Sequence, residues 1–471
     1  MKILENINPK RVMSFFEDIC AIPHGSGNTK KISEYCLNEA KKMGLEALTD
    51  SMNNVIIKKS ASKGFENQPT VILQAHLDMV CEKTPESTID FEKDGISIAI
   101  DGDYITADGT TLGGDDGIGV AMILAVLEDN TLSHPPIEAL FTADEETGMF
   151  GADALDGNLL KGRKMINIDS EAEGVLTVSC AGGARCEIRL PAEKSVPLSP
   201  CYEIIIEGLK GGHSGVEIHK GRYNSNMLMA ELLNKLTHPY NIVNIEGGSK
   251  DNAIPARTVC TLSTDEDIKA IATEFKNQKL SKENPDLEIT VFERTNANSG
   301  FSTEASAKIT AFLLSLPNGV QKMSEDIDGL VQTSLNLGIL KTEQKGIYLT
   351  FAVRSSVNDE KTALIQSLKE ITLRVGGTFE DSGYYPAWEY RKDSPLREAM
   401  VEQFEKLYGK KPVVEAIHAG LECGILSDKL SGLDAVSFGP NMEAIHTPDE
   451  KLSISSVERS YTYLCKILEN I

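Results

Sequence analysis

Acidic residues and histidines follow short apolar runs in this chain, and their placement constrains the fold more than any other feature. Three such groups are His76 with Asp78 after residues 71–75, Glu145 with Glu146 after residues 137–143, and Asp169 after residues 164–168. Each apolar run has the length and composition of a buried strand. In an open α/β sheet, ligands bind in the crevice beyond the carboxyl ends of the strands. We therefore expect these side chains to lie together at one edge of a mostly parallel sheet.

Two more segments supply side chains of the same kind. Asp115 and Asp116 occupy a glycine-rich turn, residues 112–117, just before a predicted helix, and His446 lies far downstream in residues 443–448. Imidazoles and carboxylates are typical zinc ligands, and a pair of divalent ions can hold water and a carbonyl group together. The sequence therefore predicts a two-metal site, in which Asp115 is short and rigidly placed enough to bridge the ions.

The remaining ligands divide between the two ions. We assign His76 and Asp169 to one ion and Glu146 and His446 to the other, with Asp115 shared. Each ion then has three protein ligands and keeps the open position that catalysis requires.

Two acidic residues beside these ligands have separate predicted roles. Asp78 lies two residues after His76, so on an extended chain both side chains point to one side and the carboxylate can orient the imidazole. Glu145 precedes Glu146 and points elsewhere, which suits a general base that takes a proton from water and passes it to the leaving amine.

The order of predicted elements indicates a discontinuous domain. Up to Asp169, helices (11–20, 29–43 and 118–128) alternate with strands (54–59 and 71–75), which is typical of a doubly wound, mostly parallel α/β sheet. The middle of the chain is α+β, with strands at 185–190, 202–207, 259–263, 287–292 and 346–353 and helices at 224–236, 265–277 and 361–375. The first pattern then resumes with helices at 395–408 and 454–468 and buried strands at 413–416 and 435–438. We predict a catalytic domain of residues 1–183 and 388–471, interrupted by an inserted α+β lid domain of residues 184–387.

Charge and composition exclude several classes of protein. The 471 residues carry a formal net charge of -23, and no basic patch that could bind nucleic acid is visible. No apolar stretch reaches the roughly 18–20 residues that span a membrane, and the amino-terminal residues lack the apolar core of a signal peptide. The 9 cysteines are scattered and odd in number. These features favour a cytoplasmic protein with reduced thiols.

Three segments, residues 73–80, 111–119 and 141–148, carry a resemblance to a known family. Together with residues 211–215, 251–255, 418–424 and 437–440, they resemble the co-catalytic zinc peptidases that include carboxypeptidase G-like, aminoacylase and tripeptidase enzymes. The similarity extends along essentially the whole chain.

The resemblance implies the same metal ligands and the same base, and it adds residues that bind substrate. His213 in the inserted domain would stabilise the oxyanion of the tetrahedral intermediate, and Asn252 and Arg354 would bind the carboxylate or carbonyl groups of the substrate. Gly420 would let the main chain approach the substrate amine. One departure is Asp116, where relatives often carry asparagine, and its extra negative charge would alter metal affinity or preference.

Together with the predicted metal site, the resemblance implies a dizinc peptidase that hydrolyses unblocked dipeptides, including Xaa-His and β-alanyl-histidine. Cobalt or manganese would also suit this ligand set. The substrate is a small peptide, and a homodimer formed through the lid is consistent with the sequence. Two alternatives stay open: an N-acyl-amino-acid deacylase with the same metal chemistry, and a metal- or peptide-binding protein without catalysis.

Overall fold

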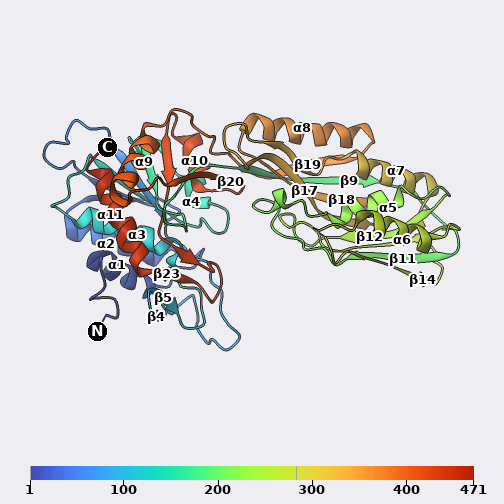
Figure 1. Ribbon diagram of the computed structural model, residues 1–471, viewed down its shortest axis with the longest axis horizontal. Coiled ribbons are helices and arrows are strands. Elements are labelled where there is room, and N and C mark those ends of the chain that lie inside the picture. The colour runs from blue at the N-terminus through green and yellow to red at the C-terminus, as the bar shows by residue number, and fades with distance from the viewer. Residues whose placement is uncertain (1, 283) are drawn as a thin grey trace. The chain divides into compact units, whose positions relative to one another are not determined.

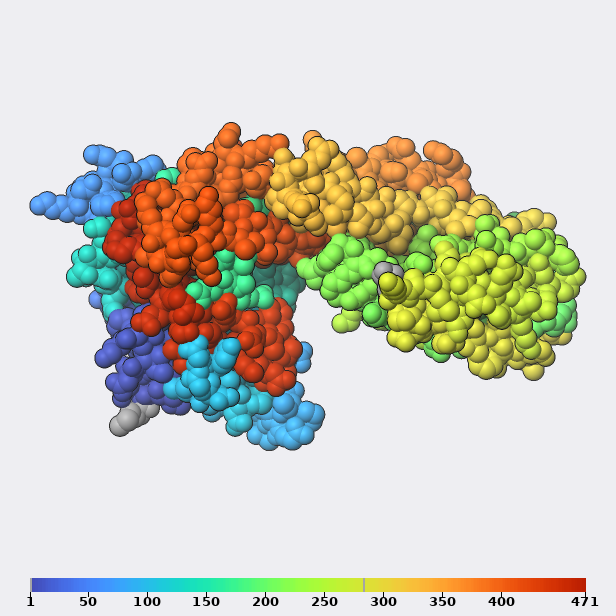
Figure 2. Space-filling model, in the orientation of Figure 1, coloured from blue at the N-terminus to red at the C-terminus, as the bar shows by residue number. Residues whose placement is uncertain are grey.

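The computed structural model describes residues 2–282 and 284–471, which form two compact units (Figure 1). The first unit comprises the chain up to Ser179 together with Tyr390–Ala416 and Leu421–Ile471. The second comprises Cys180–Glu389 and Ile417–Gly420. Figure 2 shows the discontinuity of the first unit, because its surface combines blue and cyan amino-terminal segments with orange and red carboxyl-terminal ones.

An eight-stranded mixed sheet forms the centre of the first unit. The strands lie in the order β1 (Glu46–Thr49), β2 (Val55–Lys59), β6 (Ile137–Thr142), β3 (Val71–His76), β7 (Lys164–Asn167), β21 (Asp434–Ser437), β8 (Val175–Cys180) and β20 (Val413–Ile417). The four strands β6, β3, β7 and β21 are mutually parallel, and the neighbours β2 and β8 run antiparallel to them. Every residue of β3, β6 and β21 is buried, as expected for central strands covered on both faces.

Helices and a small second sheet complete this unit. The helices are α1 (Lys10–Cys20), α2 (Lys30–Met43), α3 (Gly114–Glu128), α4 (Phe150–Ala154), α9 (Pro395–Tyr408), α10 (Glu422–Lys429) and α11 (Ile454–Leu468). The small sheet has the order β22 (Met442–Glu443), β23 (Lys451–Ser453), β5 (Tyr104–Ala107) and β4 (Ile98–Asp101). Helix α3 is apolar on all sides because it is sandwiched between α1 and β3.

Close packing fixes the start of α3. A Cβ atom at Gly119 would lie 2.5 Å from the main-chain oxygen of Ile168 and 2.3 Å from a carboxylate oxygen of Asp116. Only glycine therefore allows this helix to approach the segment that follows β7.

A nine-stranded antiparallel sheet dominates the second unit. Eight strands lie in the order β14 (Glu288–Arg294), β11 (Cys201–Glu207), β13 (Thr258–Ser263), β12 (Asn241–Gly247), β17 (Val331–Glu343), β18 (Gly346–Ser355), β9 (Gly182–Pro191) and β19 (Thr378–Tyr385), and β16 (Gly319–Met323) pairs with β17. The pair β10 (Lys194–Ser195) and β15 (Gly300–Phe301) is separate. The helices are α5 (Ser225–Leu233), α6 (Ile268–Lys279), α7 (Thr303–Ser315) and α8 (Asn358–Arg374). Their buried faces and the sheet share one apolar core.

The predicted mixed α/β fold with a parallel-containing sheet is confirmed. One predicted strand differs in its burial. Residues 413–416 form a strand as predicted, but not a buried one. They belong to β20, which is the last strand in the sheet order, and Val413 is 58% exposed. A short apolar run predicts a strand but does not distinguish a central strand from an edge strand, because burial depends on which strands lie beside it.

Among the described residues, no helix is both long and apolar enough to cross a lipid bilayer.

Candidate active site

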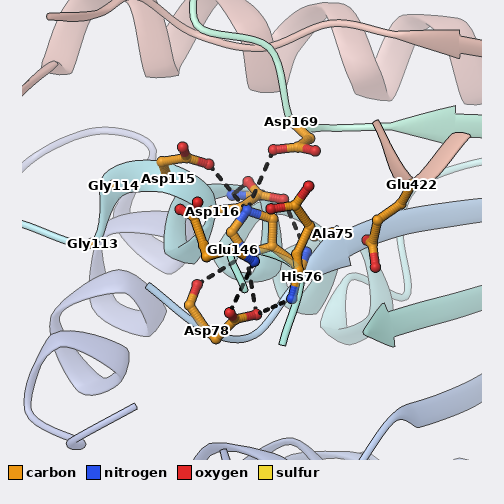
Figure 3. Close-up of polar contacts among 12 residues, drawn as sticks. Ala75, His76, Asp78, Gly113, Gly114, Asp115, Asp116, Glu146, Asp169 and Glu422 are labelled. Atoms are coloured by element: carbon orange, nitrogen blue, oxygen red, sulfur yellow. Dashed lines mark hydrogen bonds and ion pairs between the residues drawn. The ribbon is translucent and has the colours of Figure 1, made fainter. Parts of the chain in front are cut away.

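The carboxyl ends of three adjacent parallel strands bring three of the predicted ligands, His76, Glu146 and Asp169, to one edge of the large sheet (Figure 3). His76 is the last residue of β3 and pairs with Thr142, the last residue of β6. Asp169 follows the end of β7 by two residues, and the segment with Glu146 follows β6. Parallel neighbours end at the same edge, so side chains separated by tens of residues in the sequence converge here.

Asp115 lies between the two histidines. Its Oδ1 atom is 3.1 Å from Nε2 of His76, and its Oδ2 atom is 3.1 Å from Nε2 of His446. Asp115 is in the first turn of α3, whereas His446 is in the loop after β22 and has a left-handed backbone with φ of 60°. One carboxylate thus presents a different oxygen to each imidazole, which is the arrangement of a bridging ligand.

The other predicted ligands complete two groups around this bridge. Oδ1 of Asp169 lies 3.5 Å from Nε2 of His76, and Oε1 of Glu146 lies 2.8 Å from Nε2 of His446. Three sets of side chains have all their ligand atoms within 4.8 Å of one another: His76 with Asp116 and Asp169, His76 with Glu145 and Glu146, and Asp115 with Glu146 and His446.

The electrostatics of this cluster fit divalent cations. Burial raises the pKa of Asp169 to about 6, and nearby carboxylates add to the effect. Burial also opposes a charge on His76, but Asp115 and Asp169 nevertheless raise its pKa well above the ordinary value. Hydrogen bonds to Asp115 and Glu146 raise the pKa of His446 to about 10. Buried anions at this density require positive charge, and imidazole with carboxylate is a donor set that zinc accepts.

Asp78 contacts this site differently from the sequence prediction. The acceptor closest to Nδ1 of His76 is the main-chain oxygen of Asp78 at 2.9 Å, while its carboxylate is 3.7 Å away. The carboxylate instead accepts hydrogen bonds from the Ser26 hydroxyl at 2.7 Å and from the main-chain N–H groups of Glu145 and Glu146 at 2.9 and 3.3 Å. The carboxylate of Asp78 therefore holds the loop after β6 more directly than it holds the imidazole.

Asp116 participates in the site more closely than the sequence indicates. It is fully buried, and its carboxylate accepts hydrogen bonds from the main-chain N–H groups of His76 at 3.1 Å and Gly119 at 3.2 Å. It also belongs to the group around His76 and Asp169. Burial, together with the charge of Asp169, raises the pKa of Asp116 well above its ordinary value. This carboxylate thus connects the end of β3 to the start of α3.

A buried polar network lies behind His76 and was missed in the sequence. Glu422, at the start of α10, accepts hydrogen bonds from Gln74 at 2.7 Å and from the Thr142 hydroxyl at 2.5 Å. Asn167 donates to the side-chain oxygen of Gln74. The network therefore connects β7, β3 and β6 close to the metal-ligand cluster, and burial raises the pKa of Glu422 to about 8. A single glutamate with no periodic neighbours gave no signal for this role.

The four predicted substrate-binding residues lie in the second unit. Nδ1 of His213 accepts hydrogen bonds from the main-chain N–H groups of Gly215 and Val216, both at 3.2 Å. In the neutral ring, Nε2 must then carry the proton, so it is available as a donor. The main chain of Asn252 is held near this histidine, because its oxygen accepts from Ser214 at 2.9 Å.

Arg354 and Gly420 are the other two. Arg354 lies on β18, and its Nη1 atom donates to the hydroxyl of Tyr385 at 2.8 Å. Its buried Nε atom has no hydrogen-bond partner among the described residues. This leaves donor capacity for an anionic group. Gly420 is the last residue of the short segment Ile417–Gly420.

Comparisons with known proteins agree over the whole length of the chain. Residues 72–470 match the model of peptidase family M20/M25/M40. The chain is 35% identical to the cytosol non-specific dipeptidase of Escherichia coli (strain K12), covering 100% of this chain and 99% of that protein. The crystal structure of aminoacylhistidine dipeptidase from Vibrio alginolyticus is similar with a TM-score of 0.92 and 36% identity, over 99% of this chain and 97% of that one. The aminopeptidase PepT from Bacillus cereus shares the fold, with a TM-score of 0.58 and 19% identity over 98% of each chain.

Zinc binding to the metal-free protein is expected to release at least one proton per chain at about pH 8, because the His446 imidazole must be neutral to act as a ligand. The pKa of His446, raised to about 10 by Asp115 and Glu146, keeps this ring protonated at that pH in the absence of metal. Calorimetric titration with zinc in two buffers of different ionisation enthalpy measures the released protons. Zinc binding without proton release would contradict the prediction.

The variant His446→Asn serves as the internal control and should release about one proton fewer, because the proton of the His446 imidazole is then absent. The raised pKa of His446 also affects the stability of the metal-free protein. The ion pairs of His446 with Asp115 and Glu146 contribute their full stabilisation below the imidazole pKa of the unfolded chain, ~6.5. That contribution is lost as the pH rises through about 10.

Proposed function

The chain belongs to peptidase family M20/M25/M40, and from this we propose that it is a metal-dependent dipeptidase of the cytosol that hydrolyses unblocked dipeptides, including those ending in histidine. The observation that carries the proposal is the Asp115 carboxylate, which has one oxygen on each of two imidazoles. The full-length similarity to the cytosol non-specific dipeptidase and to aminoacylhistidine dipeptidase supports the substrate class.

We assign the metal ligands as follows. His76 and Asp169 would hold one divalent ion, Glu146 and His446 would hold the other, and Asp115 would bridge them. Zinc is the ion that we propose, and cobalt or manganese would fit the same donors. When bound, such a pair polarises a peptide carbonyl and makes nearby water more acidic.

Glu145 is the proposed general base. It belongs to the same group of side chains as His76 and Glu146, and burial raises its pKa well above the ordinary value. A carboxylate with a raised pKa can hold a proton at neutral pH. Glu145 would take a proton from the attacking water and deliver it to the nitrogen of the leaving amine.

Residues of the second unit are assigned to substrate recognition. His213, with the proton on Nε2, would donate to the oxyanion of the tetrahedral intermediate. Arg354 would pair with the terminal carboxylate, and Asn252 would bind a carboxylate or carbonyl oxygen. The main chain at Gly420 would contact the substrate amine. We assign the second unit the role of a lid that limits substrate length, and a homodimer formed through it is part of the proposal.

A substrate panel tests this function directly. The metal-depleted protein, before and after zinc is restored, is assayed with Ala-His, β-Ala-His, Gly-Gly, Leu-Gly-Gly and N-acetyl-Met. We expect zinc-dependent hydrolysis of the free dipeptides only. Hydrolysis of N-acetyl-Met alone would make the protein a deacylase, and no hydrolysis despite bound metal would make it a binding protein.

Replacing Glu145 by Gln should lower kcat for Ala-His by about 10²- to 10⁴-fold, because the amide cannot accept the proton of the attacking water. Zinc content should not change, because the assigned ligands remain. The matched control is Asp144→Asn. In the wild type, the carboxylate of Asp144 accepts a hydrogen bond from the main-chain N–H group of Gly27 at 2.7 Å. That variant should keep most of its activity. Equal activity in Glu145→Gln and the wild type would show that another group is the base.

Replacing Arg354 by Met should lower kcat/KM for Ala-His by about tenfold to a hundredfold, the range expected for a lost hydrogen bond to a charged group. The effect should be much smaller for the amide Ala-His-NH₂, which has no terminal carboxylate. Arg294→Met is the control, because Arg294 is solvent-exposed and paired with Glu203 in the same unit. An equal loss on both substrates would remove Arg354 from carboxylate recognition.

A further inference from the structure

Glu450 is a buried carboxylate that belongs to the same loop as His446 but is not among the assigned ligands. It is 3% exposed and lies four residues after His446, immediately before β23. Its Oε2 atom accepts hydrogen bonds from the main-chain N–H groups of Leu112 at 2.8 Å and Gly113 at 3.3 Å, and Oε1 accepts from Gly114 at 2.8 Å. These three groups belong to the turn that leads into Asp115.

Glu450 binds a turn that has no polar side chain of its own at residues 112–114. Gly113 precedes α3 with a left-handed φ of 73° and, as a glycine, has no side chain of its own with which to cap the helix. A Cβ atom at Gly113 would lie 2.8 Å from the Met79 sulfur, and one at Gly114 would lie 3.1 Å from Oε1 of Glu450. The first N–H groups of a helix lack intrahelical partners, and a carboxylate from elsewhere in the chain satisfies those of this turn.

Glu450 also determines where the His446 loop sits. Among the described residues, the hydrogen bonds that leave residues 444–450 for other segments come from His446 and Glu450. The imidazole of His446 is 43% exposed, so packing alone does not fix it. The Glu450 carboxylate therefore anchors this loop to the residues that precede Asp115, at the point where His446 and Asp115 approach to 3.1 Å.

We propose that Glu450 is a positioning residue, which sets the distance between Asp115 and His446 and thereby controls how tightly the ion between those two side chains is retained. This rests on the proposed function, because it presupposes a metal pair bridged by Asp115. Glu450 acts through two ligand-bearing segments and does not itself contact the ion. Replacing one carboxylate oxygen of Glu450 by an amide nitrogen loosens both the turn before Asp115 and the loop that carries His446. His76 and Asp169 stay in place at the ends of β3 and β7.

Glu138 offers a matched control for a purely structural role. It is also 3% exposed, and its carboxylate accepts hydrogen bonds from the main-chain N–H groups of Lys161 at 2.8 Å and Gly162 at 3.0 Å. It lies on β6 opposite Ile72, near the amino end of β3 and away from the His76 end. Glu138→Gln thus removes the same kind of buried carboxylate–amide contact at the other end of the strands.

The test measures zinc retention and does not depend on activity. Wild type, Glu450→Gln and Glu138→Gln are loaded with zinc and challenged with excess EDTA, and the zinc remaining per chain is followed over time. We expect one of the two ions to leave Glu450→Gln about 10- to 100-fold faster than wild type, the range typical of residues that orient metal ligands. The other ion keeps His76 and Asp169 as ligands and should leave more slowly than the first, and Glu138→Gln should match wild type throughout.

A second variant covers the case in which Glu450→Gln fails to fold. Gly114→Ala keeps the Glu450 charge but pushes a methyl group against its carboxylate, and it should also release one ion faster. Wild-type release from both Glu450→Gln and Gly114→Ala, or equal acceleration in Glu138→Gln, would overturn the proposal. A wild-type chain that binds no zinc pair would instead overturn the proposed function itself, so the two failures are distinguishable.

Discussion

Repulsion between buried carboxylates is the constraint on which the architecture of the site depends. Asp115, Asp116, Glu146 and Asp169 lie within a few ångströms of two imidazoles, and all of them are shielded from water to a large extent. Isolated charges in such surroundings are costly and shift their pKa values to become neutral. The raised pKa values of Asp116 and Asp169 are this response in the protein without metal. Because the clustered carboxylates are costly to bury as anions without compensating positive charge, a site of this kind favours the binding of cations.

Main-chain N–H groups provide the other part of the compensation, and they also provide rigidity. Asp78 binds the N–H groups of Glu145 and Glu146, Asp116 binds that of His76, and Glu450 binds those of the turn before Asp115. In each case a carboxylate from one segment holds the main chain of another. The loops that carry the proposed ligand side chains are thus connected through backbone contacts, which fix their positions without occupying those side chains.

The central part of the fold and the clustering of the candidate ligand residues could be predicted from the sequence, because both depend on local patterns. Buried parallel strands are continuous apolar runs, and polar residues directly after them mark the edge where ligands bind. The longest strand, β17, was missed because Gly338 interrupts it at a register shift between Leu337 and Ile339, and a glycine inside a polar, Thr- and Asn-containing run looks like a loop. Glu422 and Glu450 were missed for a different reason: a solitary acid in a sequence does not reveal which main chain it will meet.

The polar network of Gln74, Asn167, Thr142 and Glu422 has a consequence for how the chain reaches its native state. The hydrogen bonds among these four side chains form only when β6, β3 and β7 pair in one alignment. A slip of β3 by a single position would turn Gln74 to the other face and leave its amide unpaired, at a cost of about 1–3 kcal/mol, and would carry His76 away from Asp115. An all-apolar strand would tolerate such a slip far better. The buried amide of Gln74 therefore destabilises sheets in which β3 is misaligned. This selection of one strand alignment requires neither an ion nor a substrate.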